Sequence, residues 1–379
     1  MKRWTRLGRM YTADSLADGA SRVDVVRLYD RARSAHVERV LGSDTRQLLL
    51  FRRRSYDFLD QLPPNVIQSS RLSAVLKVAR ARPRVIEINE PAVVGAWSLV
   101  LPVTAVIRFL RLLPMPGATR SAIVFYAIEN HDPIPSIAQR IGVPEAFVRF
   151  VWVAVCKWLF STADRVAFGT EASRSMYAEW VPKYSDAGCS KTKVFPALEV
   201  ARFADVAKDR SVVFLGAFEY RKGIDIVLEA WQQPGRLEGA HLTLIGKGEL
   251  ADDVLAFCLK TPSASVFIDP PRSLIRELLD AAAVLVLPSR TLPGWREQVG
   301  LPIVEALSAG CEIVTSQSTG LADWLIANGH AVLPESATPT DYGRTIDEVL
   351  RRPGRTRTIL SSLPKGVSGR SAADRWLCA

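Results

Sequence analysis

The sequence has little of what disulfide-rich, metal-binding or membrane-spanning chains need. Its five cysteines stand apart, with no C-x-x-C pair and no histidine spaced to complete a zinc site. This pattern predicts reduced, mostly buried thiols and no bound metal. The uncharged stretch 91–107 contains Pro102 and is shorter than the roughly 20 residues that span a bilayer, so we interpret it as a buried helix.

Signals for secretion and for nucleic-acid binding are also missing. The basic start Met1–Arg6 is followed by no apolar run of the signal-peptide kind, so we expect a cytoplasmic protein. Zinc-finger spacing, an RNP-type aromatic strand and a clear helix-turn-helix pattern are absent. Nucleic acid is therefore not an expected partner, and no low-complexity segment or internal repeat is found.

What the chain does have is enough apolar residues for two cores and an uneven charge. Its 379 residues are 48% hydrophobic, which predicts two domains, 1–205 and 206–379, with the last helix able to pack back on the first. The net charge of +10 lies entirely in the first half, which has 30 Lys and Arg against 19 Asp and Glu, whereas the second has 19 against 20. A basic first domain suits anionic lipid headgroups or a phosphorylated acceptor.

Short apolar strands alternate with helical patterns along both halves. Predicted strands are 23–28, 47–51, 85–88, 122–127, 165–168, 211–216, 241–245, 265–269, 284–289, 311–316 and 331–333, and the clearest helices are 224–231, 274–283 and 301–309. Repeated βα units predict the α/β class, with a doubly wound parallel sheet in each domain. Ligands bind beyond the carboxyl ends of such strands.

The most informative segment runs from Glu297 to Glu305, with Gly300 between the two carboxylates. The N–H groups of Val299, Gly300 and Leu301 open an apolar helix, where unpaired donors and the helix dipole favour a diphosphate. Each carboxylate offers two strong hydrogen-bond acceptors to a vicinal diol. One glutamate would therefore bind sugar hydroxyls and the other the ribose diol. The segment therefore predicts a nucleotide-sugar site.

This segment resembles the E-x7-E motif of retaining glycosyltransferases of the GT-B fold, family 4 type. Four further segments resemble that family in order and spacing: Phe214–Gly223, Leu244–Leu250, Val284–Ser289 and Ser318–Gly320. The resemblance covers about Ser211 to Leu333 and is weaker before it. It implies two Rossmann-like domains facing a cleft, and sugar transfer from a nucleoside diphosphate without a cofactor or a metal ion, with retention of configuration.

The resemblance also assigns roles to individual residues. It implies nucleotide-sugar binding by Gly216, Gly246, Val299, Gly300, Leu301, Glu305, Ser289 and Gly320, and catalytic roles for Glu297, Arg221, Lys222 and His131. Arg221 and Lys222 would stabilise charge on the departing phosphate. Family members carry an arginine after the strand glycine where this chain has Ala217, so Arg221 is the expected substitute. Asp269 stands where a glycine is common.

The first domain offers fewer assignments. Its candidate for contact with the sugar is the strand end 126–132, which contains His131. Glu90 is a weaker candidate, and Tyr29–Ser34 occupies the place of the family's glycine-rich loop. The segment 146–160 is apolar almost all round, with two Trp residues and two cations, which fits either a buried helix or one lying in a membrane interface.

The expected function is sugar transfer to a glycan or polyprenyl-linked acceptor in cell-surface polysaccharide or glycolipid assembly, with an anionic membrane surface as a candidate partner. The alternatives are a non-catalytic nucleotide-sugar binder and a basic protein that binds membrane or nucleic acid.

Overall fold

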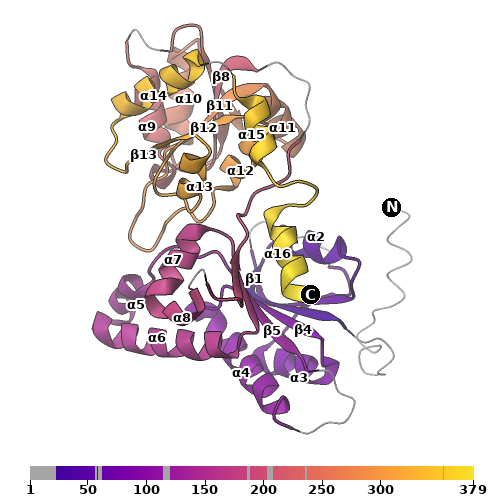
Figure 1. The fold of residues 1–379 in the computed structure, drawn as a ribbon. Helices are drawn as coiled ribbons and strands as arrows, with labels where there is room; N and C mark the ends of the chain where they lie inside the picture. The colour runs from indigo at the N-terminus through magenta and orange to yellow at the C-terminus, as the bar shows by residue number, and fades with distance from the viewer. Residues whose placement is uncertain are drawn as a thin grey trace.

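The computed structural model describes residues 23–55, 58, 62–113, 120–185, 188–202, 208–234, 237–352 and 354–379. Within these residues the chain forms two α/β domains, each with one parallel sheet flanked by helices (Figure 1). The predicted α/β class with two doubly wound sheets is confirmed. The predicted domain boundary between residues 205 and 206 lies outside the described residues.

The first domain is built on a seven-stranded parallel sheet in the order β3-β2-β1-β4-β5-β6-β7. Its strands are β1 Val25–Ala32, β2 Gln47–Arg54, β3 Val66–Gln68, β4 Val85–Asn89, β5 Ala122–Ala127, β6 Arg165–Phe168 and β7 Thr192–Val194. Its helices are α2 Ser34–Leu41, α3 Arg71–Ala81, α4 Val94–Leu110, α5 Ile134–Ile141, α6 Glu145–Thr162, α7 Glu171–Trp180 and α8 Pro182–Ser185. Successive side chains of a strand point to opposite faces, so Val26 and Val25 are buried in different cores.

The segment Tyr29–Ser34, expected to be a loop, is strand up to Ala32 and then begins α2. Within this part of β1, Asp30 forms an ion pair with Arg52 of β2 at 3.5 Å, and Arg31 pairs in register with Arg53. The ion pair with the neighbouring strand allows charged Asp30 to lie within β1. The short strands β3 and β7 at the two edges of the sheet were not predicted.

The second domain has a six-stranded parallel sheet in the order β10-β9-β8-β11-β12-β13. Its strands are β8 Asp209–Leu215, β9 His241–Gly246, β10 Ala264–Ile268, β11 Ala282–Leu287, β12 Glu312–Ser316 and β13 Ala331–Leu333. Its helices are α9 Ile224–Trp231, α10 Ala251–Lys260, α11 Arg272–Ala281, α12 Leu301–Ser308, α13 Ala322–Ala327, α14 Pro339–Arg351 and α15 Thr356–Ser362, with a 3-10 turn at Tyr220–Lys222. Every predicted strand of this domain lies within two residues of an observed one.

The last helix, α16 (Gly369–Cys378), leaves the second domain and packs on the first sheet (Figure 1). Its Ala373 and Leu377 are buried against β1, β4 and β5. On the same face Arg370 contacts Glu87, which also accepts from Arg27 of β1. The first sheet is therefore completed by the far end of the chain.

Helix α6 has one buried side and one exposed side. Trp152 is buried against Trp97 and Trp180, with ring centroids 4.9 and 5.7 Å away. Phe150, on the opposite side, is 73% exposed. The search of the described residues finds no helix long and apolar enough to cross a membrane.

Candidate functional site

The Glu297 side chain lies at the carboxyl edge of the second sheet, where it meets a lysine from far along the chain. Its carboxylate forms an ion pair with the Lys222 ammonium, and both side chains are nearly nine-tenths buried. Ser289, which follows β11, donates its hydroxyl to the same carboxylate oxygen at 3.3 Å. Two strand-end loops and the segment before α12 thus place three of the predicted residues together.

An unpredicted residue, Trp295, lies beneath both candidate cations. The Arg221 guanidinium is 4.8 Å and the Lys222 ammonium 5.0 Å from the centre of its ring. Cations are attracted to an indole face, so Trp295 orients both side chains. Arg221 is also paired with Glu219, which neutralises much of its charge. Lys222 is paired as well, with Glu297, but its side chain is 13% exposed against 31% for Arg221, so less water screens its charge.

The start of α12 has the backbone that the anion-site prediction requires. Gly300 has φ +76°, a left-handed conformation that glycine adopts without strain, and it is the residue before the helix. Val299 is buried, whereas Leu301 is 63% exposed, so the first turn is open on one side. Glu305 lies one turn further on and is half-buried. Burial, together with the nearby Glu305, raises the pKa of Glu199.

The remaining predicted glycines lie at strand ends or in the loops that follow them, at the same edge. Gly216 follows β8 and donates its N–H to Ile245 of β9 at 3.0 Å, beside Gly246. Gly320 donates its N–H to the Glu297 carbonyl at 3.0 Å. A Cβ on Gly320 would lie 2.1 Å from the Gln298 carbonyl oxygen, so no other residue fits without moving this loop.

The first domain reaches the same loop through the segment after β5. Asn130 donates its side-chain amide to the Glu297 carbonyl at 2.9 Å, and Gln298 donates its amide to Glu129 at 2.8 Å. His131 comes next in this segment, and its Nε2 is buried without a hydrogen-bond partner among the described residues. The structure thus places His131 at the domain junction, one residue from a direct contact with the Glu297 segment.

Glu90, the weaker candidate, is buried behind that segment. Its two carboxylate oxygens accept the backbone N–H groups of Ile128 at 2.6 Å and Glu129 at 3.2 Å. Burial, reinforced by the Glu129 carboxylate, raises the pKa of Glu90 to about 8, although the two N–H donors oppose the rise. Glu90 is therefore the junction group that titrates near neutral pH.

This titration predicts a pH dependence of stability. The pKa of Glu90 is higher in the folded protein than the ordinary value of 4.5, so between about pH 4.5 and 8 the folded state binds more protons than the unfolded state. The unfolding free energy should then fall as the pH rises through that window. Urea unfolding of the wild type and of Glu90→Gln at several pH values checks it: the Gln variant should lose this slope, and equal slopes would contradict the assignment.

Sequence reasoning missed Trp295 and assigned no separate role to Glu129, Asn130 or Gln298. Gln298 directly follows Glu297, and Glu129 and Asn130 precede His131, so they lay inside segments already singled out. Their cross-domain pairing had no signal in the sequence, since the partners are more than 160 residues apart. Asp269, where a glycine is common in the family, has φ +48° and keeps the left-handed backbone.

Comparison with known proteins adds two findings. Residues 200–362 match the family model described as Glycosyl transferases group 1. Solved structures with the same arrangement of two domains include WaaG, a glycosyltransferase involved in lipopolysaccharide biosynthesis, with a TM-score of 0.57, 12% identity, and coverage of 93% of this chain and 99% of that one. The second domain thus matches the group 1 glycosyl transferase family, and the chain has the GT-B fold.

Two further GT-B structures have similar scores. Anabaena Alr3699/HepE in complex with UDP has a TM-score of 0.60 at 17% identity, covering 93% of this chain and 95% of that one. A UDP-forming α,α-trehalose-phosphate synthase from Burkholderia xenovorans has a TM-score of 0.60 at 13% identity, covering 94% and 98%. At sequence identities this low, the similarity shows only that these proteins share the fold.

Curated relatives match a shorter part of the chain. The uncharacterized glycosyltransferase MJ1607 of Methanocaldococcus jannaschii is 27% identical over 164 residues, 42% of this chain and 40% of the relative. The uncharacterized glycosyltransferase MJ1178 of the same organism is 24% identical over 149 residues, 39% and 40%. The GT-B chain therefore aligns with about two fifths of the length of these relatives.

The search of the described residues of the GT-B chain finds no cluster of three or more His, Cys, Asp or Glu that could hold a metal ion. The five cysteines are free thiols, with Cys156 and Cys311 buried.

Proposed function

We propose that this protein is a glycosyltransferase that moves a sugar from a nucleoside-diphosphate donor to an acceptor hydroxyl. The observation that carries the proposal is the Lys222–Glu297 pair beside the open first turn of α12, within the group 1 domain. Bond cleavage leaves negative charge on the departing diphosphate. A largely buried ammonium can stabilise that charge strongly, because little water screens it.

The pair suggests a division of labour. Without donor, Glu297 neutralises Lys222. A bound diphosphate competes for the ammonium and releases the Glu297 carboxylate toward the sugar hydroxyls, while the N–H groups at the start of α12 hold phosphate oxygens. Glu305, one turn along, is placed to accept from the ribose diol.

The finer properties follow from the family resemblance and are part of the proposal. We infer retention of anomeric configuration and a metal-independent reaction, with His131 contacting the sugar from the first domain. The acceptor is a glycan or a polyprenyl-linked glycan, as in cell-surface polysaccharide or glycolipid assembly. WaaG, which shares the fold, is described as acting in lipopolysaccharide biosynthesis.

A panel of nucleotide-sugars tests the proposal. A donor that binds the folded protein should raise the melting temperature in proportion to occupancy, and the same donor should be hydrolysed or transferred when radiolabelled. Binding without turnover would favour a non-catalytic sugar-nucleotide binder, an alternative supported by Ala217 and by the Glu219 partner of Arg221. A panel without any stabilising donor would contradict both.

Glu305→Gln is expected to weaken donor binding and leave the fold intact. The substitution keeps the shape of the side chain but removes its charge, so the loss should be about 1.5 to 3 kcal/mol, the range for hydrogen bonds to charged groups. Calorimetry with the donor from the panel measures it. Glu348→Gln, a change in the same domain at an exposed residue of α14, is the matched control. Equal affinity in Glu305→Gln and the wild type would remove Glu305 from the site.

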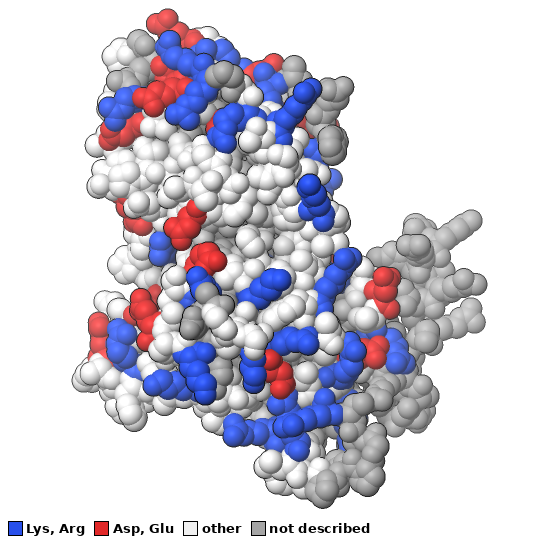
Figure 2. All heavy atoms as spheres, in the orientation of Figure 1, with Lys and Arg blue, Asp and Glu red and all other residues white. Residues whose placement is uncertain are grey.

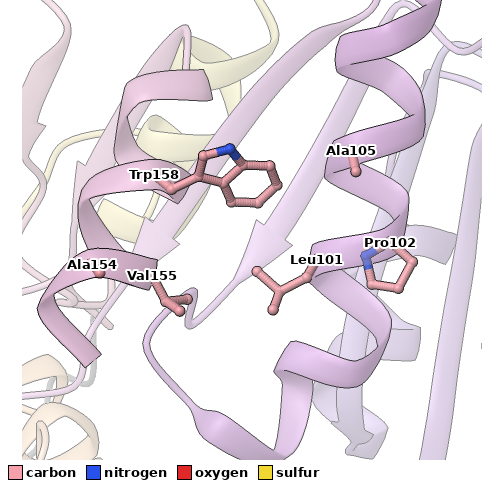
Figure 3. Close-up of a pocket in the computed structure, with 6 residues that line it drawn as sticks. All are labelled: Leu101, Pro102, Ala105, Ala154, Val155 and Trp158. Carbon is pink, nitrogen blue, oxygen red and sulfur yellow. The ribbon is translucent and has the colours of Figure 1, made fainter. Parts of the chain in front are cut away.

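We also propose that the first domain attaches to an anionic membrane surface through one face of α4 and α6. Side chains of the two helices line an apolar groove of about 490 Å³ (Figure 3): Leu101, Pro102, Ala105, Ala154, Val155 and Trp158. Exposed Phe109 and Phe150 continue the apolar stripes along the helices. Lys157 and Arg108 are exposed on the same helices. Figure 2 shows Lys and Arg spread over much of the first domain on the face drawn.

This α4–α6 face predicts a salt-sensitive attachment. Flotation with phosphatidylglycerol vesicles should increase with anionic lipid and decrease with salt, because headgroup attraction acts within a Debye length. Phe150→Ser should weaken binding and leave its salt dependence, since aromatic insertion and charge contribute separately. Trp152 is unsuitable as a probe because it is buried. Leu259→Ser, at an 89% exposed leucine of α10, is the control. Absent binding at low salt, with the protein folded, would end this proposal.

A further inference from the structure

A basic hollow, separate from the apolar groove between α4 and α6, lies at the carboxyl edge of the first sheet, away from Glu297. It has a volume of about 600 Å³ and is formed by the end of β2, the end of β3 and the first turn of α3. Its lining is polar and cationic: Arg52, Arg53, Gln68, Ser69, Ser70, Arg71 and Leu72. Neither the group 1 match, which begins at residue 200, nor the Lys222–Glu297 site includes this hollow.

The first turn of α3 supplies donors. The helix has eleven residues and is capped by Ser70, whose hydroxyl accepts the Ser73 N–H at 3.3 Å. The N–H groups of Arg71 and Leu72 have no acceptor among the described residues. Unpaired N–H groups and the positive end of the helix dipole attract an anion.

Ser69 is an independent sign that a ligand belongs here. It is only 7% exposed, and its hydroxyl has no hydrogen-bond partner among the described residues. A buried hydroxyl without a partner is unfavourable, so this group is set up to donate to an oxygen that enters the hollow. Ser69 lines the hollow between β3 and α3.

The arginines differ in their freedom. Arg52 is fixed by Asp30 at 3.5 Å and by the Gly95 carbonyl at 3.1 Å. Arg53 and Arg71 are exposed and have no acidic partner among the described residues. Such guanidinium groups bind a phosphate dianion with paired hydrogen bonds, and the start of α3 and the Ser69 hydroxyl belong to the same hollow.

We propose that this hollow, the Arg53–Arg71 hollow, binds a phosphomonoester carried by the acceptor. In the sheet order, β2 is three strands from β5, whose following loop holds His131. The hollow therefore lies roughly 15 Å along the same edge from the domain junction, at the usual strand spacing. An acceptor that spans this distance has its phosphate well separated from the hydroxyl that receives the sugar. The acceptor role rests on the proposed function, whereas phosphate binding does not.

Inorganic phosphate is the probe for the hollow. Melting temperatures are measured as phosphate replaces chloride at constant ionic strength, for the wild type, Ser69→Ala and the double variant Arg53→Gln/Arg71→Gln. We expect phosphate to stabilise the wild type, about tenfold weaker apparent affinity in Ser69→Ala, and no stabilisation in the double variant. Arg80→Gln, at an exposed arginine at the other end of α3, should respond like the wild type.

Phosphate also suits the donor site, so each arm is repeated in Lys222→Ala. In the Lys222→Ala background, stabilisation by phosphate should still require Arg53 and Arg71. If it no longer requires them, the proposal is overturned. A wild type that phosphate does not stabilise, or a double variant that responds like the wild type, would overturn it as well. If no nucleotide-sugar binds but the Arg53 and Arg71 dependence remains, the hollow stands and the proposed transferase function falls.

Vesicles distinguish the two sources of such a phosphate. Phosphatidylcholine vesicles with phosphatidic acid present a monoester, and vesicles with phosphatidylglycerol at matched surface charge present a diester. A lipid-linked acceptor predicts that only the phosphatidic acid vesicles lose binding in the double variant. A soluble phosphorylated acceptor predicts equal vesicle binding by the wild type and the double variant, with the inorganic phosphate response still lost in the variant.

Discussion

Lys222→Ala is expected to lower kcat about 100- to 1,000-fold, the usual effect of removing one group that stabilises transition-state charge. The donor KM should change much less, because Lys222 stabilises phosphate charge that grows mainly as the bond between sugar and diphosphate breaks. The ion pair with Glu297 places the ammonium in the site before donor arrives. Steady-state transfer rates with the donor identified in the panel measure the two constants separately.

Two other variants make this result interpretable. Lys260→Ala removes an exposed lysine at the end of α10 and should leave both constants unchanged. Arg221→Ala tests whether Arg221 substitutes for the arginine that Ala217 replaces. Because the Arg221 side chain is 31% exposed and that of Lys222 only 13%, we expect a smaller loss than in Lys222→Ala. Normal kcat in Lys222→Ala, with the melting temperature unchanged, would remove the lysine from the chemistry.

All six strands of the second domain could be predicted, because β8, β9, β11 and β12 are largely buried, whereas the helices α10, α13, α14 and α15 were not predicted. Strand β11, for example, has five of its six residues buried and reads as a continuous apolar run, as parallel strands do. Loops at the strand ends carry the glycines and charges that ligand binding needs. Motif positions and strand ends therefore coincide in the sequence.

The first domain was harder because long-range partners decide its local structure. Asp30 is compatible with strand β1 only because Arg52 lies beside it, 22 residues away. Helix α6 is apolar all round, and periodicity could not separate the buried Trp152 from the exposed Phe150. One face of that helix packs on the core and the opposite face lies at the surface.

Within the candidate site, the sequence predicted the separate parts but not their partners. The Lys222–Glu297 pair joins residues 75 apart, and Trp295 orients both cations without belonging to any motif that was recognised. The contacts of Glu129 and Asn130 with the second domain depend on how the domains dock. Such contacts arise from tertiary geometry, which local patterns do not encode.

Domain docking in turn depends on α16, which ties the end of the second domain to the first sheet. Gly369, its first residue, donates its N–H to the Leu198 carbonyl at 2.8 Å. Arg370 lies over the ring of Tyr126, 3.5 Å from its centre, and Asp374 contacts Arg27 at 3.2 Å. The face of the first sheet beneath α16 is therefore held by buried charges as well as by apolar packing.

Glu87→Ala is expected to destabilise the protein by about 3 to 5 kcal/mol, as removal of one partner from a buried ion pair does. Glu87 is fully buried between Arg27 and Arg370. Burial opposes ionisation, yet the two guanidinium groups lower the pKa of the Glu87 carboxyl below its ordinary value. Without it, Asp374 is the remaining acidic partner of the two guanidinium groups among the described residues, and Asp374 also pairs with Arg39. Denaturant unfolding of both proteins, compared at constant m-value, gives the difference.

The matched control is Asp24→Ala, which breaks an exposed ion pair with Arg46 at the edge of the same sheet. Exposed pairs contribute about 0 to 1 kcal/mol, so this variant should unfold close to the wild type. If α16 docks through the charges on Glu87, the Glu87→Ala protein should also lose protease protection at α16 before the second domain unfolds. Comparable stability of the two variants would mean that apolar packing by Ala373 and Leu377 holds the helix, and that the buried charges contribute little.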